Sequence, residues 1–319
     1  MRDLVIIGGG PAGLSAACLA RDKGMDVVML YTELGGRYGW RARQIRAATH
    51  WDDAGLVDVA STELVRHLIQ GATTASNCII RDHVCAIHCV NSHFRITCQT
   101  YHPLEAATVI VATGTRERRL DLPEAERFVT YGFGYTPRTY VQRVAGRRVA
   151  VVGATSRTLR GTMEIAHVAE QVYLITSAGS SLASPLGQAV RAQRNVEVLE
   201  DYQVTAVIGG DQLVEIVVAQ GTETRRLRVT HALADLGEAP NTELVRDLPI
   251  TNPEGFIVVD ERNATRTPGL FAAGDVTSGS SKHILGAADG GARAALSAYD
   301  YVLARTEIPV IRRHDTPSG

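Results

Sequence analysis

Residues Leu4–Cys18 read LVIIGGGPAGLSAAC, and this stretch decides the fold. The aliphatic run LVII predicts a buried strand, and the small apolar residues after the glycines predict the start of a helix. Between them, Gly8 permits a tight turn, Gly10 lets the backbone approach a pyrophosphate, and Gly13 lets the helix pack closely on the strand. In this context the turn predicts a dinucleotide cradle in which phosphates meet the helix N-terminus.

Length and composition are those of a globular protein with room for two domains: 319 residues, 45% hydrophobic and 21% charged. The 33 basic and 34 acidic residues give a net charge of −1, which favours neither nucleic acid nor an anionic membrane as a partner. No apolar run approaches the roughly 18 to 20 residues that span a bilayer. The first strand begins at about Asp3, which leaves no room for a leader peptide. We therefore expect a cytoplasmic protein.

A second buried strand is predicted at Met25–Tyr31, parallel to the first. A dinucleotide fold places an acidic side chain near the end of this strand, where it binds ribose hydroxyls, and Glu33 is the nearest candidate. Gly36 and Arg37 follow in a flexible turn, and the chain stays basic as far as His50. Arginines there would hold a cofactor's phosphates or a partner's acids, or would simply belong to a solvated loop.

A hairpin is predicted after an amphipathic helix at 62–70, because residues 78–100 alternate with period two and Asn91-Ser92 is a turn signal. A two-residue loop would set Val90 against His93 and Cys85 against Cys98. Cross-strand Cβ atoms lie roughly 4.5 to 5.5 Å apart, close to what a disulfide needs. The alternative is two half-buried cysteines that act as small hydrophobes. None of the five cysteines forms a C-x-x-C pair.

The strand–turn–helix pattern occurs a second time. After a buried strand at Ala107–Thr115 (ATVIVATGT) and a charged crossover, Arg148–Gly153 (RVAVVG) starts another such unit. We therefore predict an α/β fold of two Rossmann-like dinucleotide-binding domains of the three-layer ββα type, the second inserted into the first. The boundaries are 1–116 and 248–319 for the first domain and 117–247 for the insertion.

The motifs GGGPAG, VIVATGT, VAVVG-x-T, LGEAPNTEL and LFAAGDV, in this order, resemble those of the low-molecular-weight thioredoxin reductases and related two-dinucleotide-domain flavoproteins. The resemblance covers essentially the whole chain and implies an FAD enzyme that forms a homodimer. It implies that Asp275 hydrogen-bonds the ribityl chain and that the final helix points its N-terminal end at the flavin. Taken with the glycine turn, it predicts that FAD is held by Gly8, Gly10, Pro11, Ala12, Gly13, Glu33, Gly36, Arg37, Ala112, Thr113, Gly114, Gly274, Asp275, His283 and Ile284.

Two departures from that family pattern bear on function. The family carries a C-x-x-C before the second dinucleotide strand, whereas residues 129–138 (VTYGFGYTPR) contain no thiol to relay electrons. The second glycine motif reads Gly153-Ala154-Thr155-Ser156-Arg157-Thr158, so a side chain replaces the glycine that lets a pyrophosphate touch the backbone. Residues 176–180 (TSAGS) lack the family's paired arginines. These changes predict that NADPH is not the donor, unless Arg157 and Arg160 compensate.

Aromatic residues stand where the dithiol is missing, namely Tyr131, Phe133, Tyr135 and Tyr140. They would stack on the flavin or on a second planar cofactor, or would pack between domains. This profile is similar to a cyanobacterial branch of the family, the diflavin-linked disulfide oxidoreductases, which would imply two flavins per chain. His283 would place a donor at the pyrimidine edge of the flavin, or would lie on the surface. The spacing of the histidines at 83, 88 and 93 suits no zinc site, so we expect no metal.

Three functions fit the sequence. The first is an FAD oxidoreductase independent of pyridine nucleotide, with Cys85 and Cys98 as candidates for thiol chemistry and a thioredoxin-like partner. The second is a reductase fed by ferredoxin, an acidic partner that would meet the arginines at 37–46. The third is a non-catalytic flavin-binding redox sensor.

Overall fold

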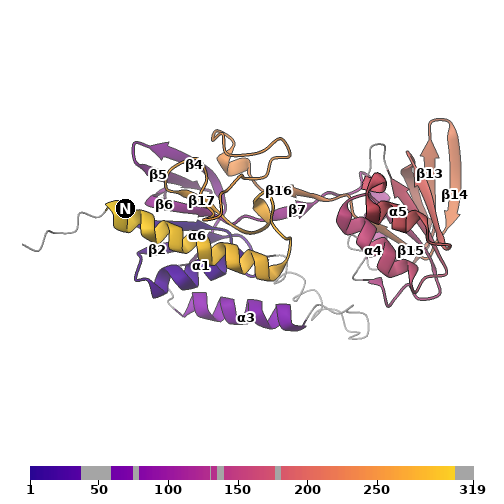
Figure 1. Ribbon diagram of the computed structural model, residues 1–319, viewed down its shortest axis with the longest axis horizontal. Coiled ribbons are helices and arrows are strands. Elements are labelled where there is room, and N and C mark those ends of the chain that lie inside the picture. The colour runs from indigo at the N-terminus through magenta and orange to yellow at the C-terminus, as the bar shows by residue number, and fades with distance from the viewer. Residues whose placement is uncertain (37–58, 75–78, 130, 135–139, 177–180, 306–319) are drawn as a thin grey trace, which may run out of the picture. The chain divides into compact units, whose positions relative to one another are not determined.

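The computed structural model describes residues 1–36, 59–74, 79–129, 131–134, 140–176 and 181–305. These residues form two compact units (Figure 1): unit 1 contains described residues of 1–43, 60–115 and 240–305, and unit 2 contains those of 116–239. The sequence placed the return to the first domain at 248, but unit 1 resumes at Pro240. The reason is that Leu244 and Val245 already pack in the core of unit 1.

The main sheet of unit 1 is parallel, in the order β3-β2-β1-β6, with β17 beside the carboxyl half of β6. These strands are β1 (Arg2–Ile7), β2 (Val27–Tyr31), β3 (Ile79–Arg81), β6 (Leu104–Val111) and β17 (Leu270–Ala272). The aliphatic run predicted to be buried is buried, since residues 4–7 of β1 are at most 4% exposed. Two antiparallel strands, β4 (Val84–Val90) and β5 (His93–Cys98), extend the sheet from β6.

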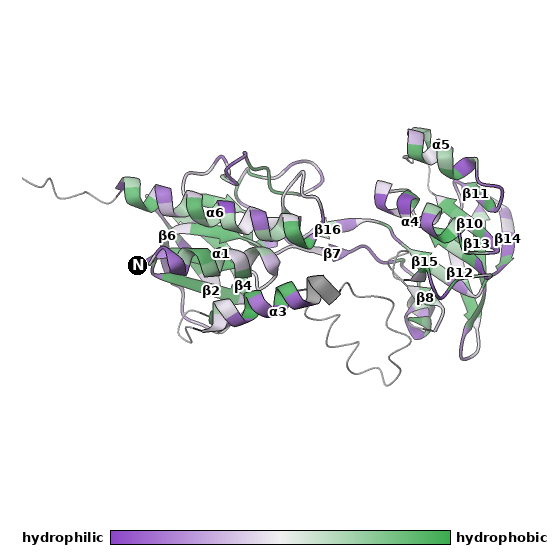
Figure 2. Cartoon of the chain, turned by 60° about the horizontal axis from the view of Figure 1, so that its bottom comes forward, coloured by the Kyte–Doolittle hydropathy of each residue, from purple (hydrophilic) through white to green (hydrophobic). Residues whose placement is uncertain are grey.

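Three α-helices lie within the described residues of unit 1: α1 (Pro11–Asp22), α3 (Val59–Thr73) and α6 (Ile284–Arg305). Helices α1 and α6 lie side by side over one face of the sheet (Figures 1 and 2). Their contact is close because Gly291 has no side chain, and a Cβ there would collide with the Ala12 carbonyl. The opposite face is covered by β4, β5 and the segment that contains the short helix η5 (Glu243–Val245).

Unit 2 repeats the arrangement, with a parallel sheet in the order β11-β10-β9-β15-β8. Its strands are β8 (Phe133–Gly134), β9 (Arg148–Val152), β10 (Gln171–Thr176), β11 (Val196–Glu200) and β15 (His231–Ala234). Helices α4 (Ser156–Ala166) and α5 (Pro185–Arg191) cover one face. An antiparallel sheet of β12 (Gln203–Gly209), β13 (Leu213–Gln220) and β14 (Glu223–Arg228) covers the other. The strands between these layers are coloured as hydrophobic in Figure 2.

Two short strands lie where the chain passes between the units. They are β7 (Thr115–Glu117) and β16 (Glu238–Pro240), and they pair with each other. The short helices η2 (Pro123–Phe128), η4 (Ser181–Ala183) and η6 (Gly274–Val276) complete the described elements. The layered α/β fold with a second Rossmann-like unit inserted into the first is thus confirmed.

The predicted hairpin forms, but its register changes near one end. Val90 pairs with His93 as expected, and the pairing continues to Ala86 and Thr97. A β-bulge then sets Val84, not Cys85, against Cys98. The predicted pairing of Cys85 with Cys98 is therefore wrong, because the bulge adds one residue to β4 and shifts every later pair.

Candidate functional site

The candidate site is a cavity of about 530 Å³ at the carboxyl edge of the parallel sheet of unit 1. Four strands end there in the spatial order β2, β1, β6 and β17, each followed by residues that line the cavity. They are Tyr31–Glu33 after β2, Gly8–Gly10 after β1, Ala112–Gly114 after β6 and Gly274–Asp275 after β17. The cavity crosses the sheet edge, which is where open α/β sheets bind their ligands.

The three glycines of the first turn have different structural roles. Gly8 has φ +122°, and a Cβ there would overlap the Ala112 carbonyl. A Cβ on Gly13 would overlap the Gly8 carbonyl, so this glycine lets α1 pack against the turn. Gly10 differs, because a Cβ there would meet no protein atom within 4 Å and would enter the cavity that Gly10 lines. Gly8 and Gly13 thus allow close packing, whereas the missing side chain at Gly10 leaves this part of the cavity open.

Helix α1 begins at this turn without a side-chain cap. Its N-cap is Gly10, Pro11 follows at the first helical position, and no acidic residue stands in the first turn. The first N–H groups of a helix have no partner within the helix and carry partial positive charge. Pro11 and Ala12 line the cavity, so this end of α1 is suited to hold an anion such as a phosphate.

One end of the cavity lies beyond β2. Glu33 lines it there, and the Gly35 N–H donates to the Gly9 carbonyl, which joins this turn to the glycine turn. Gly36 has φ +56° and lies against Gly10, while Arg37 lies outside the described residues. The adjacent Asp82 was not singled out from the sequence. Its backbone N–H bonds Tyr31, and its carboxylate accepts backbone hydrogen bonds from His83, Thr100 and Tyr101.

The other end is formed by the residues after β6 and β17. Thr113 donates to the Asn241 carbonyl at 2.6 Å, and the Asn241 side chain donates back to the Thr113 carbonyl at 2.9 Å. Asn241, in the LGEAPNTEL motif, thereby holds the loop after β6. Gly274, at φ +77°, approaches the Ala12 side chain, and Asp275, His283 and Ile284 line the cavity beside it.

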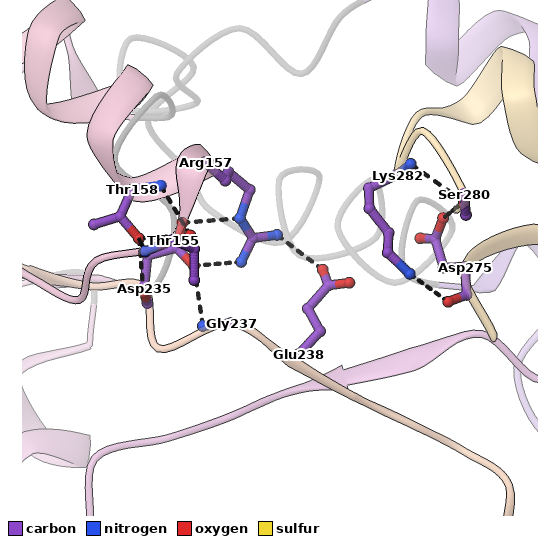
Figure 3. A network of polar contacts seen from close by, with 9 residues as sticks. All are labelled: Thr155, Arg157, Thr158, Asp235, Gly237, Glu238, Asp275, Ser280 and Lys282. Atoms are coloured by element: carbon purple, nitrogen blue, oxygen red, sulfur yellow. Dashed lines mark hydrogen bonds and ion pairs between the residues drawn. The ribbon is translucent and has the colours of Figure 1, made fainter. Parts of the chain in front are cut away.

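The equivalent turn of unit 2 keeps only the first of the three glycines. Gly153 has φ +127° and lies against the Asp235 carbonyl as Gly8 lies against Ala112. The second and third positions are Thr155 and Thr158. Figure 3 shows their arrangement: Thr155 Oγ1 accepts from the Thr158 N–H at 3.1 Å, and Thr158 Oγ1 accepts from the Thr155 N–H at 3.2 Å. The helix end that would face a phosphate is capped by the chain itself.

Comparison with known proteins agrees with this geometry. Residues 2–292 match the pyridine nucleotide-disulphide oxidoreductase family. The chain belongs to this family. A subunit of alkyl hydroperoxide reductase in Staphylococcus aureus is 30% identical over 304 residues, which are 94% of this chain and 59% of that protein. Its counterpart in Staphylococcus epidermidis is 29% identical with the same coverage. The chain thus spans about three-fifths of the length of these relatives.

Solved structures show the same fold. Thioredoxin reductase from Streptococcus pyogenes superposes with a TM-score of 0.74 at 23% identity, over 95% of this chain and 99% of that one. Thioredoxin reductase from T. acidophilum gives a TM-score of 0.65 at 25% identity, again over 95% and 99%. This family member is therefore a thioredoxin reductase-like flavoprotein, as the sequence motifs predicted.

Arg157 of this oxidoreductase does not face an open phosphate site. Its guanidinium bonds both carboxylate oxygens of Asp235, at 2.5 and 2.8 Å, and Glu238 at 2.8 Å (Figure 3). Both acids are almost fully buried, with side chains 0% and 6% exposed. Burial lowers the pKa of Arg157, but the two carboxylates more than offset this and hold it above its usual value. The suggestion that Arg157 replaces a lost phosphate-binding group is not supported by these contacts.

The aromatic residues that were candidates to stack on a flavin lie in different environments. Phe133 is fully buried in the core between the two sheets of unit 2, so the prediction that its ring is available for stacking is wrong. The hydrophobic environment of β8 explains this, since β8 pairs with β15 inside the unit. Tyr131 is 59% exposed and keeps an accessible ring, Tyr140 lies edge-on to His231, and Tyr135 lies outside the described residues.

Of the two cysteine candidates, only one is among the residues that line the cavity. Cys85 lines the cavity next to His83 and is exposed, while Cys98 is partly buried. Burial, with Asp82 and Cys85 nearby, raises the pKa of Cys98 to about 11, so it is a poor nucleophile at neutral pH. Both are free thiols, as are Cys18 and Cys89.

In the part of the chain that the structure describes, no three histidine, cysteine or acidic side chains gather into a group able to hold a metal ion. None of its helices combines the length and the apolar character needed to cross a bilayer.

Proposed function

We propose that this chain is an FAD-dependent oxidoreductase that takes no electrons from NADPH. The observation that carries the proposal is the contrast between its two equivalent turns. The turn of unit 1 presents an uncapped helix end and an open position at Gly10. The turn of unit 2 has a side chain at that position, and its helix end is occupied by Thr155. One cradle is suited to a dinucleotide and the other is not.

The residues of unit 1 fit FAD in the order in which they line the cavity. Glu33, beyond β2, would bind the adenosine ribose, the N-terminus of α1 would hold the pyrophosphate, and Asp275 would bond the ribityl chain. His283 and Ile284 would then lie nearest the flavin. The bound flavin would supply hydride or single-electron chemistry, while the protein sets its orientation and potential.

One ring nitrogen of His283 is engaged in a hydrogen bond within the protein. Its Nδ1 accepts a hydrogen bond from the Leu285 N–H at 3.3 Å, which caps the start of α6. A neutral imidazole that accepts at Nδ1 carries its proton on Nε2, so the ring presents a donor on its other side. This supports the proposal that His283 donates to a carbonyl at the pyrimidine edge of the flavin.

NADPH binding is opposed by three features of unit 2. Thr155 brings a Cβ and a hydroxyl to the place where a pyrophosphate would approach the backbone. Arg157 is engaged by Asp235 and Glu238, so a phosphate would have to compete with two buried carboxylates. The stretch 176–180 offers no cation for a 2′-phosphate.

We further propose that electrons pass between the flavin and a redox partner protein, of the thioredoxin or the ferredoxin kind. The solved proteins of similar fold are named thioredoxin reductases, but residues 129–138 of this chain contain no cysteine to form the usual dithiol relay. Homodimerisation is proposed from the same resemblance. Light scattering on the purified protein measures it, and a monomer at micromolar concentration would contradict it.

Anaerobic reduction tests the central proposal. The purified chain is reconstituted with FAD, excess FAD is removed, and the flavin released by heat is counted per chain; one flavin is expected, and two would assign a second to unit 2. Excess NADPH should leave the flavin absorbance unchanged over minutes, whereas dithionite should bleach it at once. A protein that cannot be reconstituted with FAD overturns the proposal. Rapid bleaching by NADPH overturns the claim that the flavin takes no electrons from NADPH.

A repaired turn serves as the matched variant. Thr155→Gly with Thr158→Ala restores the pattern of glycine, glycine and small residue, and removes the side chain that caps α4. We expect this variant to gain affinity for ADP-ribose, measured by calorimetry, because free N–H groups at a helix end bind phosphate. Equal affinity of the wild type and the variant would show that Thr155 is not what closes the site.

A further inference from the structure

A loop at the start of α6 places a lysine against a cavity-lining acid. Lys282 lies in this loop, and its Nζ donates to the Asp275 carbonyl at 2.6 Å. The Lys282 N–H donates to Ser280 Oγ at 3.2 Å, and Ser280 Oγ donates to Asp275 Oδ1, also at 3.2 Å (Figure 3). Lys282 is thus linked to Asp275 twice, directly and through Ser280.

The backbone of Lys282 is in a conformation that a lysine rarely adopts. Its φ is +54°, in the left-handed region that glycine and asparagine favour. The ammonium lies 4.2 Å from the centroid of the Phe256 ring, which holds the long side chain from the other side. A strained residue persists only where its surroundings hold it in place, and here a hydrogen bond and a ring contact do so.

The choice of lysine is itself informative. Of the 33 basic residues, only Lys23 and Lys282 are lysines, and the others are arginines. An ammonium is a compact point charge on a flexible stem, whereas a guanidinium is broad and planar. The compact ammonium of Lys282 lies against both the Phe256 ring and the Asp275 carbonyl.

We infer that Lys282 is a positioning residue for the flavin end of the cradle, and that its charge raises the reduction potential of the bound flavin. This inference rests on the proposed FAD function. Lys282 holds the Asp275 backbone and carboxylate in one geometry, which favours FAD binding. Its ammonium bonds the backbone carbonyl of Asp275, a residue that lines the cavity together with His283, and reduction adds negative charge to a flavin bound there.

Lys282→Met tests both parts, because methionine keeps the apolar stem and loses the charge and the donor. We expect the Kd for FAD to rise about tenfold, because the variant loses one charge-assisted hydrogen bond. At a fixed applied potential, the ratio of reduced to oxidised flavin should fall on the order of tenfold. A dye-coupled anaerobic titration measures this ratio, and a merely structural role would leave it unchanged.

Three comparison variants isolate the cause. Lys23→Met removes the other lysine, whose ammonium lies 5.8 Å from the Tyr299 ring, and should change neither quantity. Ser280→Ala cuts only the indirect link, so it should weaken FAD binding while leaving the potential unchanged. Lys282→Arg keeps the charge in a broader group and should retain most of the potential while binding FAD less tightly than the wild type.

The outcomes separate this inference from the proposed function. If the wild type binds no FAD, the proposed function fails. If the wild type binds FAD and Lys282→Met leaves both Kd and potential unchanged, only the inference fails. If Lys282→Met binds too little FAD to titrate, the reduction potential is measured in Lys282→Arg instead. A potential in that variant as low as that of free flavin overturns the inference that the positive charge raises the reduction potential.

Discussion

The guanidinium of Arg157 bonds both oxygens of the Asp235 carboxylate; the Asp235 side chain is wholly buried, whereas the Arg157 side chain as a whole is 35% exposed. Asp235 follows β15 and Arg157 lies in the first turn of α4, so this pair joins the strand end to the helix start. The same region in unit 1 lines a cavity instead. The glycine turns of the two units thus have similar backbone contacts, but the turn of unit 1 borders a cavity whereas that of unit 2 is next to an ion pair.

Asp235→Asn should destabilise unit 2 by about 3 kcal/mol, because it leaves a partly buried guanidinium without its main counter-charge. The measurement is urea unfolding followed by circular dichroism. Asp300→Asn is the control, since Asp300 pairs with Arg262 where both side chains are more than half exposed. That pair should contribute no more than about 1 kcal/mol. Equal losses in the two variants would show that burial does not strengthen the Arg157 pair.

The same substitution at two glycines of the first turn should have different effects. Gly13→Ala places a Cβ on the Gly8 carbonyl and should destabilise flavin-free protein by about 3 kcal/mol. Gly10→Ala meets no protein atom, so the flavin-free protein should keep its melting temperature and lose affinity for FAD. Thermal unfolding without flavin and an FAD titration provide the two readings. A Gly10→Ala protein with normal FAD affinity would remove Gly10 from the cofactor site.

The aromatic residues of unit 2 provide a similar pair. Phe133→Ala removes a fully buried ring and should cost about 3 to 5 kcal/mol of stability. Tyr131→Ala removes a ring that is 59% exposed and should cost less than about 1 kcal/mol. Denaturant unfolding measures both. A loss of stability in Tyr131→Ala as large as that in Phe133→Ala would contradict the different roles assigned to these two rings.

His231 should make stability depend on pH. Burial, with Arg147 and Arg143 nearby, lowers its pKa from 6.5 to about 4. In the folded protein the imidazole stays neutral between these values, whereas in the unfolded chain it binds a proton below pH 6.5. Stability is therefore complete above pH 6.5 and falls as the pH drops towards 4. Allowing for the part of the ring that water reaches, the loss is about 1 to 2 kcal/mol.

His231→Gln is the control for that pH dependence. It cannot titrate, so its melting temperature should fall less between pH 6.5 and pH 4.5 than that of the wild type. Parallel curves for the two proteins would assign the acid sensitivity to other groups.

The roles of the glycines could be predicted from sequence because they depend on local backbone geometry. Gly8 and Gly13 stand at fixed offsets from a strand and a helix, so the close contacts they permit follow from the motif. The hairpin shows the limit of such reasoning. Its turn and its first pairs follow from the period-two pattern, but the bulge at Cys85 leaves no mark in that pattern and changes the partner of Cys98.

Other features depend on residues far apart in the chain. Asp235 lies 78 residues from Arg157, and Asn241 lies 128 residues from Thr113. From the sequence, Arg157 was a candidate to compensate for the lost phosphate-binding groups, because its counter-charges, Asp235 and Glu238, lie far along the chain. The sequence leaves both stacking and packing open for the Phe133 ring, because only the pairing of β8 with β15 shows that it is buried.

The sequence by itself determined that the chain forms two dinucleotide-type units and that the second lacks a glycine needed for a pyrophosphate, since turns of this kind are encoded in a few consecutive residues. Only the tertiary structure decided what occupies the altered turn and what holds the end of the first cradle. Thr155 caps its own helix, Asp235 and Glu238 take up Arg157, and Lys282 reaches Asp275. These contacts depend on where folding brings distant charges and donors together, and a local pattern does not record that.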